Sequence, residues 1–201
     1  MKEQKATNVV WHEHKVTRQD RESLLKQKGV VIWLTGLSGC GKSTIANEVA
    51  YKLHKIGKLA YVLDGDNIRH GLNKDLAFSP EDRNENIRRI SEVAKLFADA
   101  GFVTLTAFIS PYRKFRNFCR ELAGPGRFFE VYVKASIETC EKRDTKGLYK
   151  KAKEGIIKDF TGINAPYEEP DAPELVVDTD IETVEESVEK VLTILKKQKI
   201  I

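Results

Sequence analysis

The sequence predicts an α/β fold, a three-layer sandwich around a five-stranded parallel sheet. From Val30 onward, short apolar runs alternate with amphipathic stretches, a pattern typical of successive βαβ units. The first apolar run leads into a glycine-rich turn, and the second ends in two aspartates. Because ligands of such sheets bind at the carboxyl ends of the strands, we expect the functional site at that edge.

Each predicted strand is short and nearly all apolar, as expected for strands that helices cover on both faces. The predicted strands are residues 30–35, 60–63, 102–108, 128–133 and 174–178. Apolar residues at helical spacing predict helices over 42–56, 80–100 and 181–197. Ser79 and Pro80 are start signals for the second helix, and Gly101 is its stop signal.

Two segments depart from this alternation. Residues 1–29 are polar and highly charged, and we interpret them as an N-terminal arm or short helix packed on the body, with Trp11 as its lone large anchor. Residues 144–173 are rich in lysine, glycine and proline and have little regular pattern. A loop of that length in a compact domain is usually functional, so we predict a lid at about 144–165 within one domain of residues 30–201.

Composition limits the class of protein. The 201 residues suit one domain. The net charge of +4, from 34 basic and 30 acidic residues, fits polyanionic ligands but is too mild to indicate nucleic acid. Three cysteines without a CxxC or Cys/His cluster predict reduced thiols and a cytoplasmic protein without zinc. The polar N-terminus and the apolar runs, all short, predict neither a signal peptide nor a membrane span.

Residues 36–44 read GLSGCGKST and match the phosphate-binding pattern G-x-x-x-x-G-K-[ST] with Gly36, Gly41, Lys42 and Ser43. The glycines let backbone N–H groups turn toward a phosphate, the lysine reaches the β- and γ-phosphates, and the serine hydroxyl binds Mg²⁺. A predicted strand precedes the motif and a predicted helix follows it, which is the context that it needs. The motif therefore predicts an ATP-binding P-loop rather than a chance glycine-rich turn.

P-loops serve GTPase switches, motors and kinases, and the remaining motifs favour a kinase. The guanine-reading pattern N-K-x-D fails at its fourth position in residues 73–76. A D-x-x-G does occur at 159–162, but it follows the fourth strand, where a γ-phosphate switch should not lie. The third strand runs into Ser110, where a motor usually has an acidic residue. The second strand ends in Asp64-Gly65-Asp66, a D-x-D typical of small-molecule kinases. Two solvated turn aspartates are the alternative reading.

Two polar residues of the helix 80–100 point to an acceptor site. Arg83 and Asn86 continue the apolar stripe of that helix at its N-terminal end, toward the ligand-binding edge of the sheet. A basic side chain there is expensive to bury unless it meets an anion. The alternative is a salt bridge between Arg83 and an aspartate of the D-x-D.

Four runs in the same order carry a family resemblance: DGDNIRHGLNKDLAFSPEDRNENIRR (64–89), AFISPYR (107–113), CEKRDTKGLYKKAKEG (140–155) and FTGINAPYEEPDAPEL (160–175). On these runs the chain resembles the adenylyl-sulfate kinases, in their stand-alone bacterial form, over nearly its whole length from Trp11. The resemblance implies phosphorylation of the 3′-hydroxyl of adenosine 5′-phosphosulfate (APS) by MgATP. The product would be 3′-phosphoadenosine 5′-phosphosulfate (PAPS), the activated sulfate donor. A homodimer and Mg²⁺ are also implied.

The motif and the resemblance together assign the site residues. ATP binding falls on Gly36, Ser38, Gly39, Cys40, Gly41, Lys42, Ser43, Thr44 and Arg143, with Ser43 and Asp64 as metal ligands. Acceptor binding falls on Asp66, Arg69, Phe78, Arg83, Asn86, Ile109, Ser110, Lys146, Gly147, Leu148 and Phe160. The catalytic residues are Lys42, Asp64 and Ser110. Phe78 and Phe160 would stack on the two sides of an adenine. Phe78 precedes a helix cap and Phe160 lies in the predicted lid, and core residues are not expected at either position. Packing in the core is the alternative.

Two roles for Ser110 stay open. The bacterial family is commonly described with a phosphoserine intermediate here. The chemistry of phosphoryl transfer favours direct in-line transfer instead, with Asp64 acting near the acceptor hydroxyl and on the Mg²⁺ shell. A structural turn or a hydrogen bond to the acceptor would also place a serine here.

Two rival functions are kept. One is a P-loop kinase for another small hydroxyl acceptor, such as a nucleoside or a shikimate-like acid. The other is a nucleotide-dependent switch or a nucleic-acid-binding ATPase that phosphorylates no small molecule.

Overall fold

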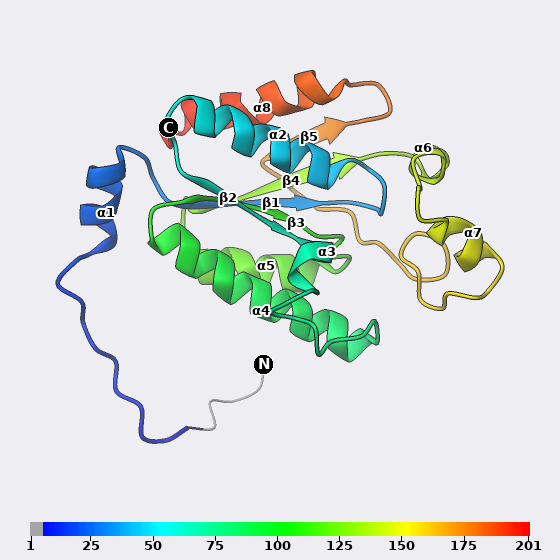
Figure 1. Ribbon diagram of the computed structural model, residues 1–201, viewed down its shortest axis with the longest axis horizontal. Helices are drawn as coiled ribbons and strands as arrows, with labels where there is room; N and C mark the ends of the chain where they lie inside the picture. The colour runs from blue at the N-terminus through cyan, green and yellow to red at the C-terminus, as the bar shows by residue number, and fades with distance from the viewer. Residues whose placement is uncertain (1–5) are drawn as a thin grey trace.

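The computed structural model describes residues 6–201 and contains the predicted five-stranded parallel sheet. Its strands are β1 (Val30–Thr35), β2 (Ala60–Asp64), β3 (Val103–Ala107), β4 (Phe128–Lys134) and β5 (Leu175–Asp178). Their order across the sheet is β2-β3-β1-β4-β5, with every pair parallel. The carboxyl ends of all strands therefore lie at one end of the molecule, on the right in Figure 1.

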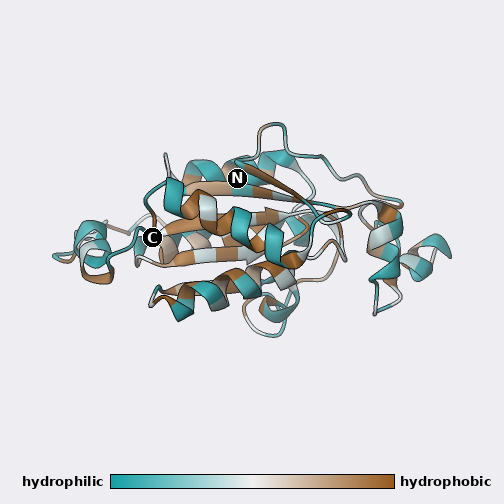
Figure 2. Ribbon diagram, turned by 90° about the horizontal axis from the view of Figure 1, so that it is seen from above, coloured by the Kyte–Doolittle hydropathy of each residue, from teal (hydrophilic) through white to brown (hydrophobic). Residues whose placement is uncertain are grey.

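Helices cover both faces of the sheet. α2 (Lys42–Lys55) and α8 (Val184–Lys197) lie on one face, and α4 (Pro80–Asp99) and α5 (Arg113–Ala123) lie on the other (Figure 1). Each face has its own buried apolar cluster. Figure 2 shows the hydrophobic strands between helices whose outer surfaces are hydrophilic. The expectation of full coverage holds for central β1 but is wrong for β2 and β5, which are edge strands with partly exposed residues.

The three predicted helices are confirmed, and the structure adds four in the segments between them. The longest addition is α5, whose buried residues include Arg116. A buried arginine interrupts the apolar stripe that identifies a helix in a sequence, which explains why this helix was missed. The others are α3 (Gly65–Ile68), α6 (Ile137–Lys142) and α7 (Leu148–Lys153), and α7 lies inside the predicted lid.

The N-terminal arm contains helix α1 (Arg18–Leu25), which begins with a capping box between Thr17 and Asp20. Arg18 and Arg21 of α1 pair with Asp99 at the end of α4, so the helix packs on the body by ionic contacts. Trp11 is 87% exposed, so the expectation that it anchors the arm is wrong. α1 lies at the opposite end of the sheet from the strand carboxyl ends (Figure 1). Residues 1–5 of the predicted arm lie outside the described residues.

Across residues 6–201, none of the helices combines the length and the apolar character needed to cross a membrane. Cys40, Cys119 and Cys140 are buried and free.

Candidate active site

The phosphate-binding motif forms a tight loop between β1 and α2. The three glycines of the loop have positive φ angles, 150° at Gly36, 80° at Gly39 and 101° at Gly41. A Cβ atom on Gly36 would lie 2.3 Å from the carbonyl oxygen of Val133, so the loop passes β4 too closely for any side chain. The loop leads into the N-terminus of α2, where backbone N–H groups without a partner in the helix can bind phosphate.

Lys42 is held inside this loop. Its Nζ atom donates to the carbonyl oxygens of Gly36 at 3.0 Å and Leu37 at 2.6 Å, and the residue is only 8% exposed. The ammonium group is therefore surrounded by the backbone that would cradle the phosphates. The motif predicts that this lysine binds the β- and γ-phosphates.

Ser43 and Asp64, the two predicted metal ligands, are brought together. The Ser43 hydroxyl donates to Oδ2 of Asp64 at 2.6 Å, while Oδ1 accepts the Asp66 N–H at 2.9 Å and so caps α3. One hydroxyl and one carboxylate fit Mg²⁺, which takes oxygen ligands and keeps waters and nucleotide phosphates as its other ligands. Within residues 6–201 there is no group of three or more His, Cys, Asp or Glu that could hold a metal alone.

Two arginines, Arg69 and Arg83, lie close to Phe78. The Arg69 guanidinium stacks on the Phe78 ring at 4.3 Å, and Arg83 donates through Nε to the Phe78 carbonyl at 2.9 Å. Burial and the nearby Arg83 charge lower the pKa of Arg69. Two cations that repel each other are stabilised when an anion binds between them.

Asn86 is buried beside these arginines, and its Oδ1 accepts a hydrogen bond from Asn73 at 2.8 Å. Among the described residues, Arg83 forms no salt bridge with Asp64 or Asp66, so that alternative is wrong. Asp66 pairs with Lys146 instead. The lid lysine therefore reaches the second aspartate, and Arg83 also reaches Thr161 Oγ1 at 3.5 Å.

Phe78 and Phe160 lie in different environments. Phe78 is 65% exposed, as expected for a ligand-facing ring. Phe160 is only 8% exposed and packs edge-to-face on the buried Tyr149 ring at 4.9 Å. The expectation that Phe160 lies outside the core is therefore wrong, because α7 folds over the segment and supplies an apolar partner.

The lid also contacts the P-loop. The Tyr149 hydroxyl donates to the Ser38 carbonyl at 2.7 Å. Burial raises the pKa of Tyr149, so the hydroxyl keeps its proton for this bond. Gly147, with φ 65°, is the N-cap of α7, and Leu148 is the first residue of that helix. The predicted acceptor residues of the lid are thereby joined to the nucleotide loop.

Arg143 follows α6 and lies beside the end of β5. It donates to the Thr179 hydroxyl at 3.1 Å and to the Thr179 carbonyl at 2.8 Å. The same hydroxyl donates to the Cys40 carbonyl at 3.0 Å. Thr179 thus connects Arg143, a predicted ATP-binding residue, to the P-loop. Sequence reasoning missed Thr179, although its position directly after the last strand is a signal for a site residue.

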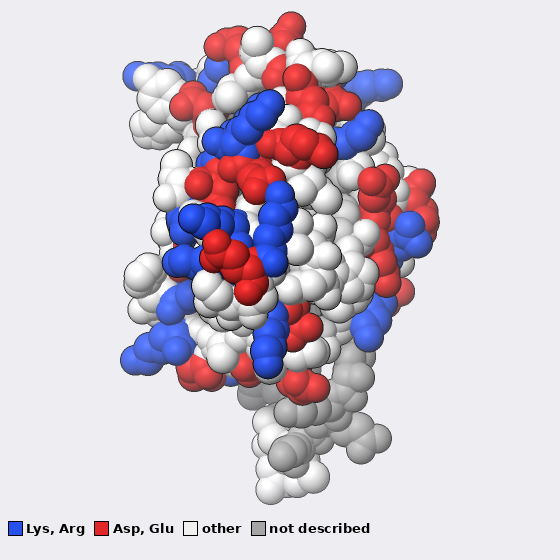
Figure 3. Space-filling view, turned by 90° about the vertical axis from the view of Figure 1, so that its right-hand side faces the viewer, with Lys and Arg blue, Asp and Glu red and all other residues white. Residues whose placement is uncertain are grey.

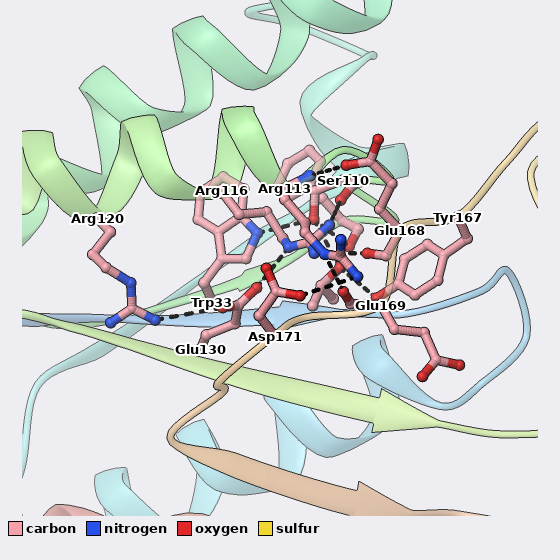
Figure 4. Close-up of polar contacts among 12 residues, drawn as sticks. Trp33, Ser110, Arg113, Arg116, Arg120, Glu130, Tyr167, Glu168, Glu169 and Asp171 are labelled. Carbon is pink, nitrogen blue, oxygen red and sulfur yellow. Dashed lines mark hydrogen bonds and ion pairs between the residues drawn. The ribbon is translucent and has the colours of Figure 1, made fainter.

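Ser110 is enclosed in a polar network (Figure 4). It is 2% exposed; its Oγ accepts from Trp33 Nε1 at 2.9 Å and donates to Thr35 Oγ1 at 3.1 Å. Thr35 in turn donates to the Ile109 carbonyl at 2.8 Å. A phosphoryl group on this hydroxyl would displace both Trp33 and Thr35. The enclosure therefore favours direct transfer over a phosphoserine in this arrangement.

Basic and acidic side chains alternate on the end of the molecule at which the strands terminate (Figure 3). The positive charge there is local rather than a continuous stripe. Such a surface suits small anionic ligands better than a long nucleic-acid backbone, which binds along an extended basic groove.

The chain is similar to known proteins over its whole length. A family model described as adenylylsulphate kinase matches residues 28–178. The adenylyl-sulfate kinase of Clostridium acetobutylicum is 58% identical over 201 residues, 100% of both chains. The APS kinase of Mycobacterium tuberculosis, solved in complex with AMPPNP and APS, is 47% identical with a TM-score of 0.80, covering 85% of this chain and 99% of that one.

A hexameric APS kinase from Thiobacillus denitrificans is 30% identical, with a TM-score of 0.67. That match covers 90% of this chain and 30% of the other.

Proposed function

The chain belongs to the adenylylsulphate kinase family, and on that premise we propose that it transfers the γ-phosphate of MgATP to the 3′-hydroxyl of APS. The product is PAPS, an activated sulfate. The observation that carries the proposal is the pairing of two subsites at one sheet edge. Lys42, Ser43 and Asp64 form the nucleotide side, and the Arg69–Arg83 pair beside Phe78 forms the acceptor side.

On the nucleotide side, the chain binds and orients the phosphates. Backbone N–H groups at the start of α2 and the Lys42 ammonium neutralise their charge. Ser43 and Asp64 would hold Mg²⁺, which supplies further charge neutralisation when it is bound with ATP. Asp64 would also orient the acceptor hydroxyl and so keep the attacking and transferring groups in line.

On the acceptor side, Arg69 and Arg83 suit a phosphosulfate, because guanidinium groups bind such anions through paired N–H donors. Phe78 offers an exposed ring for the adenine. The lid at 144–165 would close over both ligands and exclude water, which would otherwise compete as acceptor. The ion pair of Lys146 with Asp66 and the hydrogen bond of Tyr149 with Ser38 support this role.

The direct test is a coupled ADP-release assay with MgATP, with and without APS, in which mass spectrometry identifies the product. We expect ADP release that depends on APS and yields PAPS. Turnover that ignores APS but rises with another hydroxyl compound would assign a different acceptor. No acceptor-dependent turnover, together with tight, steeply salt-dependent nucleic-acid binding, would favour the ATPase alternative.

The Arg83→Ala variant is expected to raise the KM for APS ~10- to 100-fold, because a hydrogen bond to a charged group contributes about 1.5–3 kcal/mol and 1.4 kcal/mol is about tenfold. Initial rates at varied APS and saturating ATP measure it. Arg88→Ala is the matched control, since Arg88 lies on the same helix but pairs with Glu85. Equal KM values in the two variants would remove Arg83 from the acceptor site.

The Ser110→Ala variant is expected to keep turnover within about tenfold of the wild type, because it loses hydrogen bonds of about 1 kcal/mol rather than a covalent intermediate. Acid quenching of wild-type enzyme after incubation with radiolabelled ATP is expected to leave no label on the protein. Stoichiometric label on Ser110 that transfers to APS would establish the phosphoserine route instead.

Family resemblance supports a homodimer, and the buried free thiols fit a cytoplasmic enzyme. Light scattering of the purified chain would distinguish the dimer from the hexamer described for the Thiobacillus denitrificans kinase.

A further inference from the structure

Arg116 of α5 is almost fully buried, at 1% exposure, and uses three nitrogens of its guanidinium for three different partners (Figure 4). Nε donates to Glu130 Oε1 on β4 at 2.6 Å. Nη1 donates to the Ser110 carbonyl at 2.7 Å, and Nη2 donates to the Glu168 carbonyl at 2.7 Å. A buried charge of this kind is costly unless every donor is satisfied, so this side chain joins three separate segments.

The first segment is the loop after β3. Ser110 has a φ angle of 40°, in the left-handed region that residues with a side chain seldom adopt. Such a conformation persists only where the surrounding contacts determine it. The Arg116 bond to the Ser110 carbonyl is one such contact, and the Ser110 hydroxyl supplies others through Trp33 and Thr35. Arg116 therefore sets the direction of a peptide in the proposed acceptor loop.

The second segment follows the lid. The Glu168 N–H donates to the Pro111 carbonyl at 2.8 Å, and the Arg113 N–H donates to Glu168 Oε2 at 2.8 Å. One residue earlier, the Tyr167 hydroxyl lies 2.9 Å from Thr35 Oγ1. The segment that follows the lid is thus joined by hydrogen bonds to the loop after β3, and Arg116 contacts both.

The third segment is β4, whose Glu130 accepts a hydrogen bond from Arg116 Nε and so orients the guanidinium. Glu130 is buried, and its second oxygen lies 3.4 Å from Arg120 Nη2. Arg120, one turn later on α5, also pairs with Glu174, which accepts the Glu130 N–H. Arg120 therefore shares the carboxylate of Arg116, but it pairs with Glu174 where Arg116 donates to the Ser110 and Glu168 carbonyls.

We propose that Arg116 is a positioning residue for the acceptor: it holds the Ser110 peptide and the segment that follows the lid in the geometry that APS binding requires. The inference rests on the proposed function. Arg116 does not contact either substrate directly in this proposal. A change at Arg116 should therefore alter the KM for APS and kcat but not the affinity for ATP.

The test compares Arg116→Lys with Arg120→Lys. Lysine keeps a positive charge beside Glu130 but cannot span three acceptors, so we expect Arg116→Lys to raise the KM for APS and to lower kcat, each about tenfold. Its affinity for AMPPNP is expected to stay within about twofold of the wild type. Arg120→Lys is expected to leave the KM for APS, kcat and the AMPPNP affinity within about twofold.

Melting temperatures of both variants separate positioning from stability. If Arg116→Lys fails to fold, the double variant Arg116→Gln/Glu130→Gln removes both buried charges together and is expected to show the same split between APS and AMPPNP. Equal losses for both ligands, or the same behaviour in the Arg116 and Arg120 variants, would overturn the inference. A wild-type enzyme that makes no PAPS would instead overturn the proposed function.

Discussion

Replacing Lys42 with methionine is expected to lower kcat about 10³-fold, the scale on which one cationic group acts in phosphoryl transfer. The Nζ atom lies inside the P-loop, where it donates to the Gly36 and Leu37 carbonyls. Methionine fills a similar volume without the charge, so the melting temperature is expected to stay level or to rise. APS-dependent ADP release and calorimetry measure the two effects.

Lys52→Met is the matched control for Lys42→Met. Lys52 lies on the same helix but at the protein surface, where it pairs with Glu185 and Glu189 of α8. Its replacement is expected to change kcat less than twofold, because surface pairs contribute little. A Lys42 variant that stays within tenfold of the wild type would contradict the assignment of the P-loop to catalysis.

Replacing Asp64 with asparagine is expected to lower kcat about 10²-fold and to raise the Mg²⁺ concentration needed for half-maximal rate. The amide oxygen of asparagine can still accept the Asp66 N–H and cap the helix, while its NH₂ group can donate to the Ser43 hydroxyl oxygen. What it loses is the negative charge that favours the metal and orients the acceptor hydroxyl. The fold is therefore expected to survive while the chemistry does not.

Glu189→Gln makes the same chemical change, a carboxylate to an amide, at the exposed side of α8, where Glu189 pairs with Lys52. It is expected to leave both kcat and the Mg²⁺ titration unchanged. A Mg²⁺ titration of Asp64→Asn that overlays the wild type would remove Asp64 from the metal site and leave Ser43 as the only assigned protein ligand.

Local patterns were enough to predict the strands and the nucleotide loop. The glycines within residues 36–44 follow the spacing of a phosphate-binding loop, and they have the positive φ angles that such a loop needs. The strand predictions agree with the structure to within about one residue at each end, because a buried strand is a short apolar run wherever its neighbours lie. The meeting of Ser43 and Asp64 was also predicted, since parallel strands end at a common edge.

Other features depend on partners far away in the chain, which no local pattern identifies. Trp11 is apolar yet exposed, whereas Arg116 is charged yet buried, because Glu130 and two backbone carbonyls are brought to it by β4 and two loops. Phe160 is in the core because Tyr149 folds against it. In each case the sequence pattern around the residue shows the type of its side chain but not which distant residue it contacts.

The sequence alone thus determined the fold class, the P-loop and the family, because these follow from spacings within a few tens of residues. Only the tertiary structure decided which groups meet across the molecule: Lys146 with Asp66, Arg143 with Thr179, and Arg116 with the Ser110 peptide. The physical reason is that burial and hydrogen bonding are satisfied by whatever lies nearest in space. That neighbour is fixed by the sheet order β2-β3-β1-β4-β5, which periodicity does not reveal.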